Sequence, residues 1–350
     1  MVNNHERRIF LGKSFIIFFS GHFSFSYNDY LSFCSINKKD LIELITVTHQ
    51  RISLNEAVIE KDYYVTQVIH AISDLENEYF RLVFCGGTCL AKAHRIVNRM
   101  SEDVDFKIQL KKTDMNFSKT KLMKELKEFR SQIKSKLILP GLITNEPIVR
   151  NEGQYSRIII NYPSTFSASI GLRPNILLEF TFSDIRLSVE YLPVKTLIEN
   201  TLKNTVIFLP SSTHCVSIEE TAIEKWVGLT RRIIAIERKR HHDDSTLVRH
   251  VYDLNSIKSA DRINANFFTL AKAIVINDAK QFKNQHPEYS TNPGAEIRES
   301  LALLKNKPLW KERYQEFIET MVYDNTTALK YDNAIDNLEN ISAVVIDSLS

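Results

Sequence analysis

The sequence predicts an α+β protein in which a mixed helix-and-strand region precedes a helical region. Short apolar runs of strand length alternate with segments of helical periodicity across residues 37–195. Across residues 196–350 almost every regular segment has helical periodicity. The chain has 350 residues, which exceeds the usual size of one hydrophobic core. We therefore expect two domains with these limits, preceded by an N-terminal arm of unclear role over residues 1–36.

The overall composition is that of a soluble globular protein, with 43% hydrophobic and 25% charged residues. The formal net charge is only +3, so a nucleic-acid role would have to rest on a local basic patch. The four cysteines, Cys34, Cys85, Cys89 and Cys215, form neither a CxxC pair nor a zinc-binding spacing. Cys85 and Cys89 lie in an apolar stretch, where we expect buried free thiols, as fits a reducing cytoplasm.

The N-terminal arm contains KSFIIFFSGHFSFSY after several basic residues, an arrangement similar to that of a signal peptide. Its apolar core, FIIFF, is too short, and polar and aromatic residues follow it in place of a small-residue cleavage site. The same run is far too short to span a bilayer. We therefore expect an additional arm, or a start assigned too early, rather than export, and no membrane partner.

The regular segments predict the elements in chain order. Apolar residues recur at helical spacing in KKDLIELITVTHQRI and in NEAVIEKDYYVTQVIHAISDL, which predicts two helices. RLVFCGG is an apolar run ending in two glycines, which is typical of a buried strand that enters a turn. TCLAKAHRIV (88–97) then predicts a helix, and DVDFKIQL predicts a second strand. Further along we expect a basic helix at 119–137, strands at 157–163 and 175–182, and a long helix at 217–240.

The second predicted strand carries a group of carboxylates. Alternate side chains of a strand share one face, so Ser101, Asp103 and Asp105 are expected to point the same way. Two adjacent carboxylates repel each other unless a cation lies between them. Mg²⁺ prefers oxygen ligands and usually takes one or two carboxylates together with substrate phosphates. The pattern therefore predicts a Mg²⁺ site, with Mn²⁺ as the alternative metal.

The glycine pair Gly86-Gly87 supplies the second half of this predicted site. A backbone without side chains can approach a phosphate closely, and a helix beginning near Thr88 would point its free N–H groups at that anion. The alternative is a solvated acidic strand end after an ordinary capping turn. Glycines and carboxylates together, after an apolar strand, indicate a metal–nucleotide site suited to phosphoryl or nucleotidyl transfer.

The stretch GGTCLAKAHRIVNRMSEDVDF resembles the signature of the AbiEii/AbiGii toxin family of nucleotidyltransferases, in which GGTxLxK is followed by RxSxDxD. IEKDYYVTQVIHAI, NYPSTF, LRPNILLEF, ETAIEKWVGL and RHVYDL resemble further family blocks in the same order, so the resemblance covers residues 41–254. It implies a DNA polymerase β-like minimal nucleotidyltransferase core and a helical C-terminal domain. It also implies a type IV toxin with a nucleoside triphosphate substrate and a cognate antitoxin encoded nearby, with which direct contact is not required.

The resemblance also implies roles for residues of the first domain. Gly86, Gly87, Thr88 and Ser101 would bind nucleotide, and Asp103 and Asp105 would be catalytic metal ligands. Glu179, in NILLEFTF, would be the third carboxylate that a two-metal site needs, either as a metal ligand or as a base. The alternative for Glu179 is a strand-edge residue that faces water.

The helical domain would contribute phosphate-binding residues. Lys225 and Arg232 lie two helical turns apart, on one face of the predicted helix 217–240. The resemblance implies that Lys225 binds the triphosphate, whereas Arg231 could serve in place of Arg232. It also gives Asp253, in RHVYDL, a catalytic-site role such as orienting Lys225 or the nucleotide, although a salt bridge within its own helix is the alternative.

Three functions remain open from the sequence. The first is transfer of a nucleoside monophosphate to RNA, for which the resemblance suggests a tRNA 3′ end and for which the basic stretches 119–136 and 231–240 could supply phosphate contacts. The second is modification of a protein side chain by the same chemistry. The third is a non-catalytic nucleotide-binding or RNA-binding module, which the intact Ser-x-Asp-x-Asp pattern disfavours.

Overall fold

A computed structural model describes residues 36–112, 117–167 and 171–349 of the protein. Nearly all of the predicted N-terminal arm therefore lies outside the described residues. The chain divides into two compact units. Of the described residues, the sheet unit comprises those from 36 to 93 together with 101–185 and 189–215, and the helical unit comprises 94–100, 186–188 and those from 216 to 349. The domain limits expected from the sequence stay a prediction.

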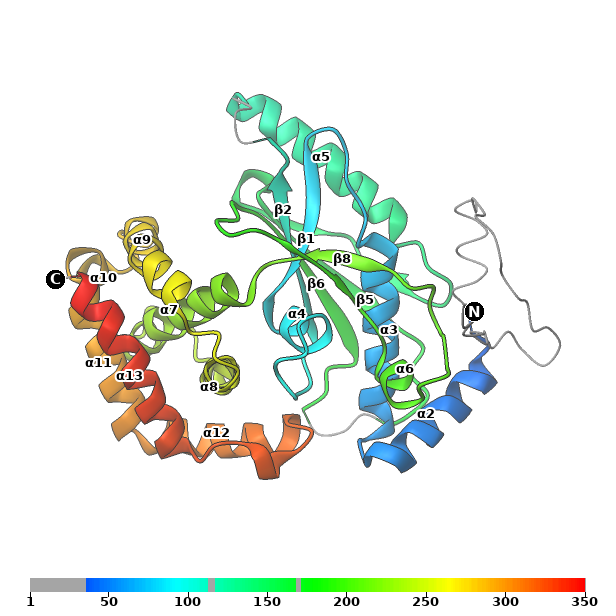
Figure 1. The fold of residues 1–350 in the computed structure, drawn as a ribbon. Coiled ribbons are helices and arrows are strands. Elements are labelled where there is room, and N and C mark those ends of the chain that lie inside the picture. The colour runs from blue at the N-terminus through cyan, green and yellow to red at the C-terminus, as the bar shows by residue number, and fades with distance from the viewer. Residues whose placement is uncertain (1–35, 113–116, 168–170, 350) are drawn as a thin grey trace, which may run out of the picture. The chain divides into compact units, whose positions relative to one another are not determined.

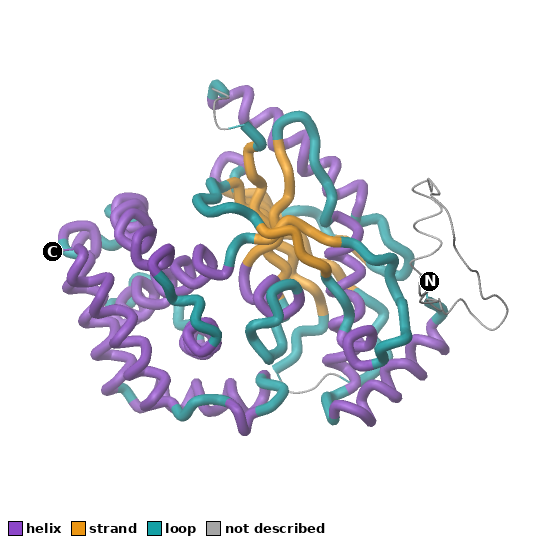
Figure 2. Tube along the Cα trace, viewed as in Figure 1, coloured by secondary structure: helices purple, strands orange, loops and turns teal. Residues whose placement is uncertain are grey.

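The sheet unit is built on one mixed sheet, drawn in orange in Figure 2. Its strands are β1 (Phe80–Cys85), β2 (Asp103–Leu110), β3 (Ile143–Thr144), β4 (Ile148–Arg150), β5 (Tyr155–Asn161), β6 (Asn175–Phe182), β7 (Glu190–Pro193) and β8 (Ser212–Cys215). Their order is β3-β5-β6-β2-β1-β8-β7, with β4 also paired to β5. Strand β2 pairs parallel with β6 and antiparallel with β1, and β1 pairs parallel with β8. This order places β2, which carries the predicted aspartates, in the middle of the sheet.

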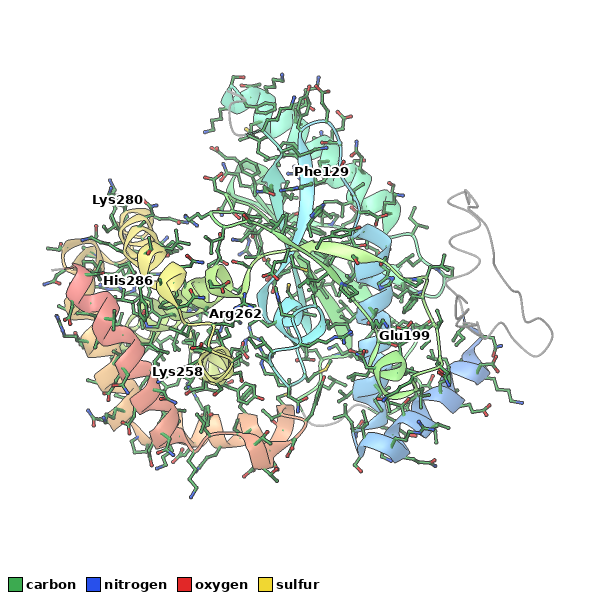
Figure 3. The ribbon with its side chains drawn as sticks, viewed as in Figure 1. Phe129, Glu199, Lys258, Arg262, Lys280 and His286 are labelled. Atoms are coloured by element: carbon green, nitrogen blue, oxygen red, sulfur yellow. The ribbon has the colours of Figure 1, made fainter. Side chains whose placement is uncertain are left out.

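One face of the sheet forms the core with four helices. These are α2 (Lys38–Ile52), α3 (Glu56–Ile72), α5 (Lys119–Lys136) and α6 (Leu197–Thr201), seen with the sheet in Figure 1. Val104, Phe106 and Ile108 of β2 are buried in this core, and Phe129 of α5 lies 5.6 Å from Phe80 between ring centroids (Figure 3). The alternate β2 residues, Asp103 and Asp105, are only half-buried. Strand alternation therefore sends the aspartates to the face opposite this core, which we call the open face.

Side-chain caps set where the helices begin. Asn37 accepts from the Asp40 N–H at 3.0 Å at the start of α2, and Asn55 accepts from the Ala57 N–H at 2.8 Å at the start of α3. At α6, Thr196 and Glu199 form a reciprocal capping box, with Glu199 labelled in Figure 3. Short polar side chains at these positions satisfy N–H groups that have no partner within the helix.

The helix after the glycine pair differs from the prediction. Helix α4 runs over Gly86–Lys92, so it begins at the first glycine and ends well before Val97. Arg95 has a left-handed backbone (φ 56°), which an α-helix cannot continue. His94 instead bonds through Nε2 to the Val216 carbonyl oxygen at 2.8 Å, within the helical unit.

The helical unit consists mainly of helices from residue 218 onward. They are α7 (Ile218–Glu237), η3 (Ser245–Val248), α8 (Arg249–Ser259), α9 (Ala265–Gln281), α10 (Pro287–Thr291), α11 (Pro293–Asn306), α12 (Pro308–Met321), η4 (Asn325–Thr327) and α13 (Tyr331–Leu349). Three of them begin with proline, which suits the first helical position because its missing N–H is not needed there. Trp226 of α7 is fully buried and donates to the Ser342 hydroxyl of α13 at 2.8 Å.

The predicted fold class is confirmed, because an α+β sheet region is followed by a helical region. Strands predicted at 175–182 and 103–110 match β6 and β2. Cys85, Cys89 and Cys215 are buried free thiols, as expected for the first two. Among the described residues, no helix is both long enough and apolar enough to cross a membrane.

Candidate active site

Three predicted carboxylates lie together on the open face of the sheet unit. Strands β2 and β6 pair in parallel register, with Asp105 directly beside Glu179. Directly paired residues of neighbouring strands project from the same face, and Asp103, two residues before Asp105, shares that face. The structure therefore brings together the carboxylates that the sequence placed on two separate segments.

Gly86 makes room for one of these carboxylates. Its backbone is left-handed (φ 74°), a conformation that favours glycine. A Cβ atom at this position would lie 3.1 Å from Cγ and 3.2 Å from Cβ of Asp105, and would overlap the Asp105 carboxylate oxygen. The sequence suggested that the glycine allows a phosphate to approach. The structure shows a more immediate reason, which is that only glycine leaves space for Asp105.

Two hydroxyl groups fix the start of β2 against α4. Thr88 is buried at 1% exposure, and its hydroxyl lies 3.0 Å from the Ser101 Oγ and within bonding distance of the Asp103 carbonyl oxygen. A hydroxyl has one proton to donate, so Thr88 serves these two acceptors in turn or shares its proton between them. Both residues thereby position the aspartate strand. Nucleotide binding by Thr88, Ser101 and Gly87, the second residue of α4, stays a prediction.

Glu179 has a partner that the sequence did not indicate. The Tyr155 hydroxyl of β5 donates to the Glu179 carboxylate. Burial, followed by the hydrogen bond and negative charge of Glu179, raises the pKa of Tyr155, so the hydroxyl keeps its proton at neutral pH. Arg157 of the same strand lies in register with Glu179. Glu179 is thus not an isolated strand-edge residue but part of a polar row across β2, β6 and β5.

Asp103 has a cationic partner, Arg173, in the segment before β6. The distance from Arg173 Nη2 to Asp103 Oδ1 is 2.7 Å. Glu102 accepts from the Arg173 backbone N–H at 2.7 Å and from its Nε at 3.4 Å. Lys61 of α3 donates to Glu102 at 2.6 Å and to the Arg173 carbonyl oxygen at 2.8 Å. Sequence reasoning missed this network because its members come from three distant segments.

The donor set on the open face suits a metal bound together with substrate. Among the residues that the structure describes, no group of three or more His, Cys, Asp or Glu side chains is arranged to hold a metal ion by itself. Two carboxylates on one strand and one neighbour in register match the way Mg²⁺ binds, with one or two carboxylates plus phosphates. The residues therefore fit a Mg²⁺–triphosphate complex better than an all-protein metal cage.

The helical unit holds the fourth predicted catalytic carboxylate, Asp253 of α8, in a fully buried cluster. Arg99 binds it with both Nε and Nη2 at 2.7 Å, and Lys225 of α7 lies 2.8 Å from Oδ2. Burial alone would raise the pKa of Asp253, but Arg99 and Lys225 outweigh it and hold that pKa well below its usual range. Burial lowers the pKa of Lys225, and Arg99 adds to this against the pull of Asp253. We name this set the buried charge cluster.

The contact between Asp253 and Lys225 matches the expected orienting geometry, whereas its catalytic role stays a prediction. Arg232 lies further along α7 and contacts a different carboxylate, Asp244. His250 of α8 has a pKa well below its usual value because of burial first and the charge of Lys225 next. Triphosphate binding by Lys225 and Arg232 stays a prediction. One contact to a carboxylate does not use all the N–H donors of either side chain, because an ammonium group has three and a guanidinium has five.

The two basic stretches differ in how far their charges are already paired. After α7, Arg238 forms ion pairs with Glu296 and Glu299, and Arg240 pairs with Glu288. On α5, Lys119 and Lys134 are also paired, with Glu152 and Glu146, whereas Lys124 and Lys127 are exposed and no partner for them is found in the described part of the chain. The exposed face of α5 is therefore the better of the two for holding a polyanion.

Comparison with known proteins identifies the family. A search of curated proteins found no match. Among solved structures, MenT4, a nucleotidyltransferase toxin from Mycobacterium tuberculosis, is similar at 15% identity and a TM-score of 0.45, over 86% of this chain and 98% of that one. That likeness is too distant to support an inference. The sequence model described as nucleotidyl transferase AbiEii toxin, type IV toxin–antitoxin system, matches residues 74–338, most of the chain. The protein therefore belongs to the AbiEii family of nucleotidyltransferase toxins.

Proposed function

We propose that this protein transfers a nucleoside monophosphate from a nucleoside triphosphate to an RNA acceptor, with a tRNA 3′ end as the first candidate, in a Mg²⁺-dependent reaction. The observation that carries the proposal is the placement of Asp103, Asp105 and Glu179 on one open face of the sheet. Family membership supports the transferase chemistry. A nucleotide substrate and an RNA acceptor imply that the reaction takes place in the cytoplasm.

The reaction joins the acceptor to the α-phosphate. The acceptor hydroxyl oxygen forms a bond to the α-phosphorus, the bond to pyrophosphate breaks, and the hydroxyl proton passes to a base. Asp103, Asp105 and Glu179 would hold Mg²⁺, which when bound stabilises negative charge on the transferred phosphate. Glu179 is also the candidate base, because its carboxylate lies in register beside Asp105 on the open face.

Other residues would bind the nucleotide and the acceptor. Gly86, Gly87, Thr88 and Ser101 are the candidates in the sheet unit, and Lys225 and Arg232 those in the helical unit. Exposed lysines of α5 would hold RNA phosphates, so RNA binding should weaken steeply with salt. In a type IV system a cognate antitoxin encoded nearby would counteract the protein without having to contact it.

The test is a transfer assay with purified protein, total RNA and cell extract, using each nucleoside triphosphate radiolabelled on its α-phosphate. We expect label at RNA 3′ ends, lost on removal of Mg²⁺ and in Asp105→Asn. Glu146→Gln makes the same carboxylate-to-amide change at an exposed surface pair with Lys134, and it should leave transfer unchanged.

The outcomes separate the functions that the sequence left open. Label on a protein band with unlabelled RNA would overturn the RNA acceptor and support protein modification. No label on any acceptor, from folded protein with all four nucleotides, would contradict the transferase proposal and favour a binding module. Label that survives in Asp105→Asn would refute the assignment of the site.

A further inference from the structure

Arg173 forms an ion pair with Asp103, one of the proposed metal ligands. Its guanidinium Nη2 lies 2.7 Å from Asp103 Oδ1. Neither the glycine pair nor the Ser-x-Asp-x-Asp pattern calls for an arginine here. The proposed function assigns the Asp103 carboxylate to a metal. Arg173 therefore competes with that metal for Asp103 Oδ1.

The backbone of Arg173 is held by a buried ion pair. The side chains of Lys61 and Glu102 are 0% and 8% exposed, and their charged atoms lie 2.6 Å apart. Glu102 accepts from the Arg173 N–H, and Lys61 donates to the Arg173 carbonyl, so both ends of this residue's backbone are anchored. Lys61 lies on α3, and Glu102 directly precedes Asp103, the first residue of β2. This ion pair therefore connects α3 to the start of β2. Breaking such a buried pair is costly because it leaves one charge without a partner.

The guanidinium end of Arg173 is much less constrained. Its side chain is 42% exposed, against 16% for Asp103. Ion pairs that are exposed to water contribute little to stability. The side chain can therefore leave Asp103 by rotation about its own bonds while its backbone stays fixed on Glu102 and Lys61. The structure thus combines an anchored backbone with a partly exposed guanidinium, which contacts Asp103 and, through Nε at 3.4 Å, Glu102.

We propose that Arg173 is a triphosphate-binding residue that rests on Asp103 until the substrate arrives. While the site holds no metal, its guanidinium neutralises Asp103. When a divalent cation occupies the carboxylates, like charges repel, and the guanidinium moves to an oxygen of the nucleotide triphosphate. A guanidinium suits this role because its planar set of donors matches phosphate oxygens in pairs. This inference rests on the proposed function, since it needs a metal–nucleotide complex at Asp103.

The proposal makes two predictions of opposite sign for Arg173→Ala. Removing this competitor from Asp103 should tighten Mn²⁺ binding to the nucleotide-free protein by about fivefold. That factor corresponds to the loss of an ion pair worth about 1 kcal/mol. Removing a phosphate ligand should weaken binding of a non-hydrolysable triphosphate analogue, with Mn²⁺ saturating, by about tenfold or more. A purely structural role would weaken both. The backbone bonds of residue 173 to Glu102 and Lys61 do not depend on its side chain, so we expect the variant to fold.

The experiment is isothermal titration calorimetry of metal-free protein, first with Mn²⁺ and then with the analogue, with thermal unfolding as the folding check. Arg173→Lys keeps the charge but not the planar donor set, so both affinities should change less than in Arg173→Ala. Lys311→Ala removes an exposed paired cation from α12 and should change neither.

Changes of the same sign in Arg173→Ala, or no change, would overturn the inference while leaving the proposed function intact. Asp105→Asn distinguishes the two failures. If wild-type protein and Asp105→Asn bind Mn²⁺ equally, the carboxylates hold no metal, and the proposed function and this inference fail together.

Discussion

The open face of the sheet unit and the buried charge cluster of the helical unit both contain carboxylates paired with cations, but in opposite environments. On the open face, Asp103 contacts a half-exposed arginine and Glu179 accepts from a neutral tyrosine. In the buried charge cluster, Asp253 is 0% exposed and is bound by two cations. The contrast shows that the charge of Asp253 is already compensated by buried cations, whereas the open-face carboxylates are less enclosed, as the proposed metal binding requires.

The strongest way to break this comparison is to neutralise one carboxylate from each region. Asp105→Asn should lower the rate of transfer by about a thousandfold. Loss of a metal ligand removes several kcal/mol of transition-state stabilisation, so the activation free energy rises. Its unfolding free energy should change by about 0.5 kcal/mol or less, as for a half-exposed site. Steady-state kinetics and urea unfolding of the same preparation measure both quantities.

Asp253→Asn should show the reverse pattern in stability. It leaves Arg99 and Lys225 buried without their shared anion, which should cost about 3–5 kcal/mol of unfolding free energy. Because the pKa of Asp253 is lowered in the folded state, its stabilisation is present above its ordinary value of 3.8 and is lost as pH falls toward the folded value. Urea unfolding at neutral and acid pH measures this. Equal stability of wild type and Asp253→Asn at neutral pH would refute the description of the buried charge cluster.

Lys225→Met sharpens the comparison within the cluster. Arg99 makes two bonds to Asp253 and Lys225 makes one, so loss of Lys225 should destabilise the fold less than Arg99→Met. A cost of about 1–3 kcal/mol is expected for losing one charged hydrogen bond. If Lys225 also binds the β and γ phosphates, the variant should lose more affinity for a nucleoside triphosphate than for a monophosphate. Equal losses by calorimetry would leave Lys225 a structural role only.

Each unit also contains a histidine whose pKa is lowered chiefly by burial, His70 of α3 and His250 of α8. The folded state then binds fewer protons than the unfolded chain below the ordinary histidine pKa of 6.5, so unfolding free energy should fall as pH falls through that value. Each group contributes at most about 1.4 kcal/mol per pH unit. His70→Gln should flatten this slope in urea unfolding from about pH 7.5 to about pH 5.5. An unchanged slope would show that His70 is charged or exposed in solution.

The smallest effect is expected from the surface cations. Changing Lys124 and Lys127 of α5 to glutamate should weaken RNA binding and reduce its salt dependence by about 0.7 in the log–log slope per lost contact. Arg238 and Arg240 are already paired with glutamates, so their alanine variants should lower stability slightly and leave RNA affinity nearly unchanged. Filter binding over a range of salt concentrations compares the two pairs. Stronger loss of RNA binding in the arginine variants would reverse the assignment.

Local patterns predicted the fold and the carboxylates well, because they depend on residues close in sequence. Strand alternation alone placed Asp103 and Asp105 on one face, and β6 matches the predicted strand 175–182. The partners of these groups could not be predicted, because they depend on tertiary contacts. Arg99 and Asp253 are 154 residues apart, and Tyr155 and Arg173 reach the site through strand pairing and loop position.

Gly86 illustrates the same limit on a smaller scale. The sequence marked it as a position where a side chain would interfere with a phosphate, and that role stays a prediction. The neighbouring atom is the Asp105 carboxylate, which reaches Gly86 because Cys85 and Asp105 pair across β1 and β2. Register, which sequence spacing did not specify, decided which group fills the space.

The most direct test of the central claim is to locate the metal. Crystals grown with Mn²⁺ and a non-hydrolysable nucleoside triphosphate analogue would show the ion by its anomalous scattering. The account predicts Mn²⁺ within about 2.2 Å of carboxylate oxygens of Asp103 and Asp105, with triphosphate oxygens completing its coordination. Mn²⁺ and triphosphate bound away from these carboxylates, with Arg173 still on Asp103, would contradict it.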